Sequence, residues 1–116
     1  MVGGEAGAQD AVKQLGGNIS LINFDLDPMQ AAVVRKVVGN YVKRLGEIVE
    51  YKELKIRLRK HEHGKSTLNE IDANAYIIHE KEVTLNASAS GYNLYSALAE
   101  VLEKIIAEAM HQNSKK

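Results

Sequence analysis

Four stretches of the chain combine hydrophobic and polar residues in patterns that indicate strands. Residues 19–26 (ISLINFDL) alternate and contain Ile and Phe, which favour strands. Residues 52–60 (KELKIRLRK) show the clearest alternation, with aliphatic side chains on one face and cations on the other. Residues 69–79 (NEIDANAYIIH) and 83–89 (VTLNASA) complete the set, and a short turn separates them. The last of these strands is built largely of small residues, so a helix can approach it closely.

Two further stretches have the period of an amphipathic helix. Asp27 is a good N-cap and Pro28 suits the first helical position, so a helix is expected over 28–45 with Gly46 as its stop. Its inner face consists of Val34, Val37, Val38, Tyr41 and Leu45. A second helix is expected over 92–111. Its apolar stripe consists of Leu94, Leu98, Val101, Leu102, Ile105 and Ala109.

The order of these elements predicts an α+β fold with the topology β-α-β-β-β-α. Each helix has a single apolar stripe, so both are expected on one face of a four-stranded mixed sheet. The first two strands should be parallel, joined by the first helix, and hairpins should follow. The domain is expected over 18–113. Residues 1–17 are expected to form a flexible tail that accommodates a short helix over 9–15, and residues 114–116 a disordered end.

Length and composition limit the classes of protein that fit. A chain of 116 residues suffices for one domain with one modest core. Cysteine is absent, which excludes disulfides and thiolate metal sites. The first twenty residues lack the apolar core of a secretory signal, and no apolar run is long enough to cross a membrane. A cytoplasmic protein without membrane partners is therefore expected.

The distribution of charge is informative although the net charge is zero. Residues 35–65 hold ten lysines and arginines against four glutamates, whereas residues 66–114 hold two lysines against seven acids. Such segregation creates a local positive field that the total conceals.

The stretch ASASGYNLYSAL resembles the C-terminal signature of the ribosome hibernation-promoting factor family, also called protein Y or ribosome-associated inhibitor. The matching positions are Ala87, Ser88, Ala89, Gly91, Tyr95 and Ala97, with Leu98 in the last place. The order of elements agrees over about residues 19–112. The resemblance implies a protein that binds RNA of the small ribosomal subunit and reduces translation under stress. The last helix departs from the family because it carries Glu100, Glu103 and Glu108 where members commonly carry lysines.

The candidate RNA-binding residues are the cations of the basic segment. They are Arg35, Lys36, Lys43, Arg44, Lys55, Arg57, Arg59, Lys60 and Lys65. The first three fall within about 100° of one another around the first helix. Those of the second strand form a row with a spacing of about 7 Å, close to that of phosphates in a nucleic acid strand. The helix cations and the row are expected to form one RNA-binding surface. Both sets also fit a solvated surface, and Glu70 and Asp72 are placed to neutralise the row.

The sequence offers little support for catalysis or for a cofactor. His61 and His63 have the spacing of two metal ligands, but no third ligand is evident nearby, so no metal is expected. A nucleophile elbow and a Gly-rich phosphate loop after a strand are both missing, so neither an enzyme nor a small-molecule substrate is indicated. Two alternatives to the ribosomal function stay open. One is a regulatory module of the same fold that binds a protein or self-associates, and the other is a double-stranded RNA-binding domain. The oligomeric state does not follow from the sequence.

Overall fold

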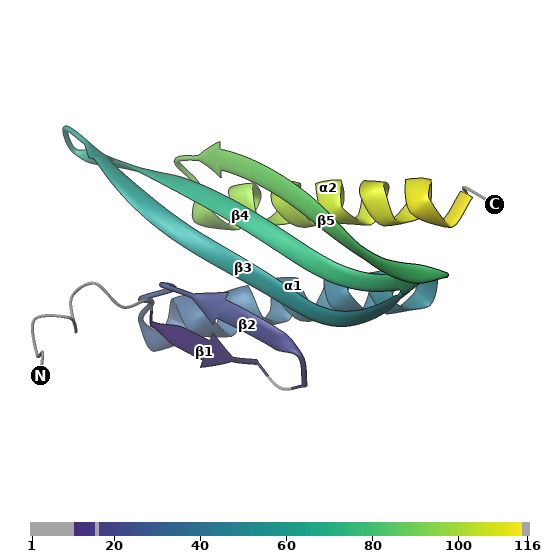
Figure 1. Ribbon diagram of the computed structural model, residues 1–116. Coiled ribbons are helices and arrows are strands. Elements are labelled where there is room, and N and C mark those ends of the chain that lie inside the picture. The colour runs from purple at the N-terminus through teal and green to yellow at the C-terminus, as the bar shows by residue number, and fades with distance from the viewer. Residues whose placement is uncertain (1–10, 16, 115–116) are drawn as a thin grey trace, which may run out of the picture.

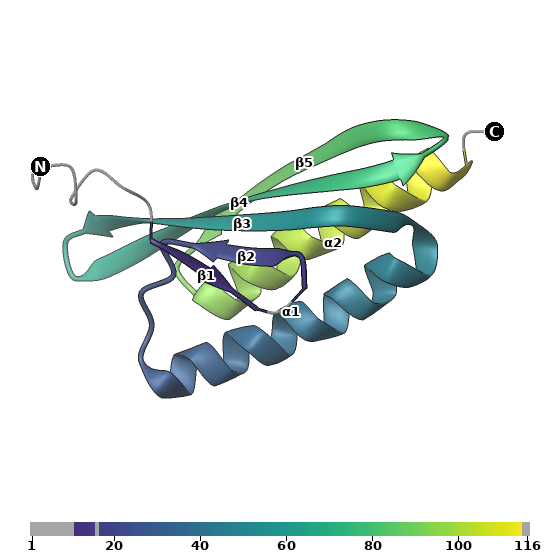
Figure 2. The same cartoon turned by 60° about the horizontal axis from the view of Figure 1, so that its bottom comes forward.

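The computed structural model describes residues 11–15 and 17–114, which form one sheet covered on one face by two helices (Figures 1 and 2). The strands are β1 (Val12–Gln14), β2 (Ile19–Ile22), β3 (Glu50–His63), β4 (Ser66–His79) and β5 (Lys81–Gly91). The helices are α1 (Pro28–Ile48) and α2 (Leu94–Ser114). The α+β class and the mixed sheet with two helices on one face are therefore confirmed.

The strands lie in the sheet in the order in which they occur in the chain. β2 and β3 are parallel and α1 joins them, as the sequence predicts. β3, β4 and β5 follow as antiparallel neighbours. The alternation along β3 places its aliphatic side chains against the helices, and neither of the described helices covers the other face of the sheet (Figure 2).

The sheet has five strands where four were expected. The additional strand β1 pairs antiparallel with β2, with Val12 opposite Ile22. Two backbone bonds fix this pairing, one from Leu15 N–H to Ile19 O and one from Asn23 N–H to Ala11 O, at 2.9 and 2.7 Å. A helix over 9–15 is therefore wrong for Val12–Gln14, whereas the rest of the expected tail lies largely outside the described residues.

α1 begins as predicted and ends later. The Asp27 carboxylate accepts a hydrogen bond from Gln30 N–H at 2.7 Å, and the Gln30 side chain accepts one from Asp27 N–H, so a complete capping box starts the helix. Gly46, the expected stop, lies inside the helix. The chain leaves the helix at Val49, whose φ of −141° and ψ of 162° are extended.

The core lies between the covered face of the sheet and the two helices. Its largest fully buried side chains come from β3, β4, α1 and α2, and include Leu54, Ile56, Leu58, Ile71, Ile77, Leu45, Leu98 and Ile105. Where α2 packs, the strands present alanines: Ala73 and Ala75 of β4 are fully buried and Ala89 of β5 is buried. Small side chains let the helix lie close to the sheet, which confirms the packing role expected for the alanines of β5.

Candidate nucleic-acid interface

Three cations of α1, Arg35, Lys36 and Lys43, are exposed, and the buried residues of the same helix face the core. Lys36 and Lys43 lie on the side of the helix opposite the sheet, whereas Arg35 lies on the flank, where it lines a small hollow with residues of the β1–β2 region. Lys36 and Lys43 are about two turns apart, or roughly 10 Å along the axis. Within the part of the chain that the structure describes, none of the three forms an ion pair or a hydrogen bond. Their charge is therefore available to an external anion.

Arg44, on the same helix, is held by α2. Its Nη1 lies 3.2 Å from Glu103 Oε2, and its guanidinium lies 5.4 Å from the centroid of the Tyr41 ring. Hydrogen bonds from Tyr41 and Arg44 lower the pKa of the Glu103 carboxyl, so this acid stays ionised and opposes the positive charge. Arg44 is thus a weaker candidate for a phosphate contact than the three free cations.

The basic row of β3 (Lys55, Arg57 and Arg59) lies on the uncovered face of the sheet, where acids of β4 accompany it. The Arg59 guanidinium pairs with the Asp72 carboxylate and lies 3.9 Å from Glu70 Oε1. The Lys55 ammonium lies 5.7 Å from the centroid of the Tyr76 ring. The neutralisation by Glu70 and Asp72 that the sequence left open is present.

The α1 cations and the basic row do not form one surface. Both helices lie on one face of the sheet (Figure 2). The alternate residues of β3 are buried beneath them, so the row projects from the opposite face. Two further candidates lie elsewhere. Lys60 Nζ lies 3.5 Å from Asp25 O, and Lys65 occupies the turn between β3 and β4. The expectation of a single basic surface is therefore wrong, and RNA contacts by the separate groups stay predictions.

The contribution of the Asp72 contacts to stability can be measured through its dependence on pH. Partial burial raises the pKa of this carboxyl, but hydrogen bonds from Ser88 and Arg59 outweigh that effect, so its pKa lies below the ordinary 3.8. Because the pKa of Asp72 is lower in the folded state, the carboxylate contributes its full stabilisation at pH values above the ordinary pKa. This contribution disappears as the pH falls through the lowered pKa. Asp72→Asn is expected to cost about 1 kcal/mol of unfolding free energy near pH 7 and much less near pH 2.

Urea unfolding at the two pH values measures this difference. Glu108→Gln is the control, because it removes one negative charge from an exposed residue that has no ion-pair partner in the described chain. An equal effect of both substitutions at both pH values would show that the Asp72 contacts add nothing to stability.

Two of the acidic side chains of α2 form ion pairs within the protein. Glu100 lies 3.4 Å from Lys104 Nζ, and that ammonium also donates to Ser88 O at 2.8 Å. Glu103 is held by Arg44, as described above. The acidic side of α2 is therefore partly neutralised by its own neighbours, which reduces its repulsion of a polyanion.

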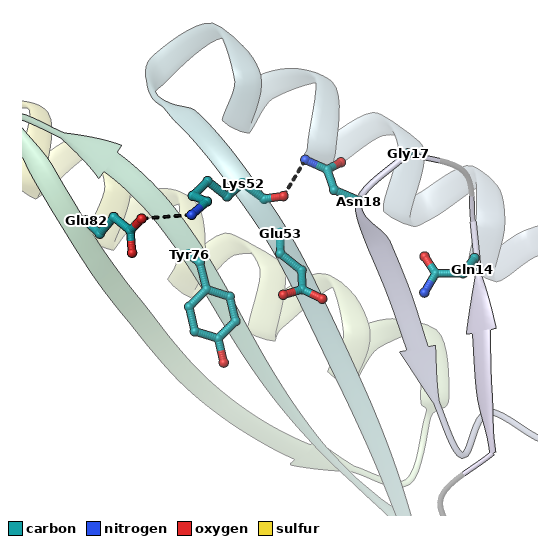
Figure 3. A pocket seen from close by; sticks show the side chains of 7 residues that line it. All are labelled: Gln14, Gly17, Asn18, Lys52, Glu53, Tyr76 and Glu82. Carbon is teal, nitrogen blue, oxygen red and sulfur yellow. Dashed lines mark hydrogen bonds and ion pairs between the residues drawn. The ribbon is translucent and has the colours of Figure 1, made fainter.

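A hollow on the uncovered face of the sheet was not found from the sequence (Figure 3). It has a volume of about 560 Å³ and is lined by Gln14, Gly17, Asn18, Lys52, Glu53, Tyr76 and Glu82. The residues come from the β1–β2 region, the start of β3, and the paired ends of β4 and β5. No sequence signal marks the irregular pairing that brings them together.

Of the two candidate metal ligands, His61 contacts a carboxylate. His61 Nε2 lies 2.8 Å from Glu70 Oε1 across the β3–β4 hairpin. Over residues 11–15 and 17–114, no group of three His, Cys, Asp or Glu side chains is arranged to hold a metal ion. None of the described helices is both long enough and apolar enough to span a membrane.

Comparison with solved structures identifies the fold. A ribosomal subunit interface protein from Coxiella burnetii aligns with a TM-score of 0.56 and 19% identity, over 84% of this chain and 97% of that one. The N-terminal domain of Protein Y from Thermus thermophilus aligns with a TM-score of 0.49 and 16% identity, over 80% and 91%. No protein-family model and no curated protein matches the sequence. The chain therefore shares its fold with a ribosomal subunit interface protein, which supports in three dimensions the resemblance to the hibernation-promoting factor family that its sequence indicates.

Proposed function

We propose that this protein is a cytoplasmic, ribosome-associated factor that binds RNA of the small subunit and reduces translation by occupying its site, without a chemical step. The observation that carries the proposal is the set of exposed cations on α1 that form no ion pair within the described chain, Arg35, Lys36 and Lys43. The fold supports it, because the Coxiella protein of the same architecture is described as a ribosomal subunit interface protein.

The α1 surface suits the RNA backbone better than it suits a base sequence. Arg35, Lys36 and Lys43 offer long, exposed cationic side chains, and α1 contains a single acid, Glu47, near its end. Contacts of this kind fix the position of a protein on RNA and contribute affinity that depends on salt, but they read no sequence. Structured RNA would accordingly be recognised by the position of its phosphates.

The remaining cations would act as secondary contacts. Lys60 and Lys65 lie toward the β3–β4 hairpin, on a different part of the molecule from Lys43. The basic row could contact RNA only from the opposite face of the sheet, after part of its charge is offset by Asp72 and Glu70. A ribosomal cleft that touches both layers would use both groups, whereas a single RNA surface would use α1 alone.

Co-sedimentation with ribosomal subunits on a sucrose gradient tests the proposal. The protein is expected to travel with the small subunit at low salt and to be released as the salt concentration rises, because each phosphate contact releases condensed counterions. If it stays at the top of a low-salt gradient that contains intact subunits, the ribosomal function is wrong. Association with a salt-independent protein partner would support the regulatory module of the same fold instead.

A further inference from the structure

The hollow on the uncovered face is built around an irregularity in the pairing of β3 with β4. Tyr51 lies opposite Ile77, but Glu53 lies opposite Tyr76, so Lys52 is an additional residue at a β-bulge. Consecutive strand residues normally point to opposite faces. Here Lys52 and Glu53 both line the hollow, because the bulge redirects the side chains. We call this feature the bulge hollow.

The surroundings hold the bulge in place. Asn18 Nδ2 donates hydrogen bonds to Tyr51 O at 3.2 Å and to Lys52 O at 2.9 Å. On the other side, Lys52 Nζ lies 2.8 Å from Glu82 Oε2 of β5 (Figure 3). The bulge hollow thus has two walls, fixed by side-chain contacts between segments far apart in the sequence.

Two polar groups of the bulge hollow have no partner in the described chain. The Glu53 carboxylate and the Tyr76 hydroxyl form no hydrogen bond or ion pair there, although both side chains are half-buried. Lys52, in contrast, is engaged by Glu82. Glu53 and Tyr76 are directly opposite each other in the pairing of β3 with β4, so their side chains share one face of the sheet. The Glu53 carboxylate, which can only accept hydrogen bonds, therefore lies beside the Tyr76 ring.

A nearby cation completes the arrangement. Lys55 lies two residues after Glu53 on the same face, with its ammonium 5.7 Å from the centroid of the Tyr76 ring. A contact of a half-exposed lysine with a ring is weak, so the ammonium can turn toward a phosphate. The carboxylate can accept hydrogen bonds from the edge of a base, and the aromatic ring can stack on the face of that base. The cation can pair with the phosphate of the same nucleotide.

Among the RNA bases, guanine fits this set. Its N1–H and 2-amino group are adjacent donors, and a carboxylate is an acceptor with two oxygens that can receive both. Single-stranded bases are bound by stacking on aromatic side chains together with hydrogen bonds to their Watson–Crick edge. A guanidinium also offers paired donors, but Lys52 and Lys55 lie beside Glu53 and would repel it.

We propose that the bulge hollow binds a guanine base, which stacks on Tyr76, donates its N1–H and 2-amino hydrogens to Glu53, and places its phosphate near Lys55. This inference deepens the proposed function, since it adds one base-reading site to a protein whose other RNA contacts are to phosphates. The guanine belongs either to single-stranded RNA or to a free nucleotide.

Titration with nucleoside monophosphates at low salt, followed by the NMR amide shifts of residues 52–55 and 76, tests the site. Guanosine monophosphate is expected to bind about tenfold or more tightly than adenosine monophosphate, the discrimination typical of a bidentate contact. Inosine monophosphate, which lacks the 2-amino group, should fall between them. Equal affinities for the three nucleotides, or no shifts at millimolar concentrations, would overturn the proposal.

Matched variants identify the side chain that gives the preference for guanine. Glu53→Gln should largely remove the preference for guanine, because the amide offers one acceptor oxygen and sets its NH₂ donor against the second donor of the base. Glu50→Gln makes the same change of charge three residues earlier in β3, outside the lining of the hollow, and should keep the preference. Tyr76→Phe should keep it too, since the ring remains. Selectivity that survives Glu53→Gln would exclude the assigned role of that carboxylate.

A short oligoadenylate with one central guanosine distinguishes the two sources of the base. If this strand binds more tightly than both the all-adenosine strand and guanosine monophosphate, the site reads RNA. If guanosine monophosphate binds as tightly as the strand, the ligand is a free nucleotide. The test is separable from the ribosomal one. A protein that binds guanosine monophosphate but not the small subunit retains this site and loses the proposed function, and the reverse result overturns this site alone.

Discussion

Replacing Arg35, Lys36 and Lys43 together with glutamine is expected to lower the affinity for small-subunit RNA strongly while leaving the fold intact. These side chains are exposed and unpaired within the described chain, so their loss removes attraction for phosphate but no ion pair or hydrogen bond. Each lost phosphate contact should reduce the slope of log K against log salt by about 0.7 to 0.9, or roughly 2 to 3 for the three. At low salt the affinity should fall by at least about 100-fold, if each contact contributes about 1 kcal/mol.

The basic row supplies a control with the same change of charge. Glutamine at Lys55, Arg57 and Arg59 also removes three positive charges, but from the opposite face and from a group that Asp72 and Glu70 already offset. Its effect on RNA affinity should be smaller, and it should reduce stability slightly through the lost ion pairs. Binding by filter retention or fluorescence anisotropy over a range of salt concentrations measures both variants. Equal losses for the two would show that net charge alone governs binding, without a defined α1 surface.

The regular elements could be predicted because burial on one side imposes a period. In β3, Leu54, Ile56 and Leu58 face the helices, and the polar alternates face solvent, as the pattern requires. In α2 the apolar stripe around Leu98 and Ile105 is likewise buried. Where one face of an element is buried, its hydrophobic pattern determines both its type and its orientation.

The parts that were not predicted depend on contacts between distant segments. β1 is three residues long and exposed throughout, so its sequence contains no burial pattern; backbone pairing with β2 makes it a strand. β3 extends to His63 and β4 begins at Ser66, beyond the ranges 52–60 and 69–79 expected for these strands, because their polar hairpin ends pair with each other. Gly64, with a φ of 61°, allows the tight turn that lets this pairing continue.

The same reason explains which features of the candidate interface were found. The cations of α1 could be placed on one side of the helix because helical geometry is local. Their separation from the basic row follows from the alternation of β3, because its aliphatic residues face the helices and the cations between them face the opposite side of the sheet. The bulge hollow was missed because a β-bulge is defined by the pairing of two strands and leaves no signature in either one.

α2 is expected to act chiefly as a packing element, and Leu98→Ala tests this expectation. Leu98 is fully buried, on the helix that covers the alanines of β4 and β5. Removing a leucine side chain from such a site typically costs about 2 to 5 kcal/mol, because contacts are lost and the surroundings collapse only partly. For a domain of this size the melting temperature should fall by on the order of 10 °C or more.

The binding readout separates packing from recognition. At a temperature where Leu98→Ala is still folded, its RNA affinity should equal that of the parent, because the free cations lie on α1. Met110→Ala, on the same helix but 56% exposed, is the control and should change neither quantity appreciably. If folded Leu98→Ala binds RNA more weakly than the parent, α2 must contribute to the interface.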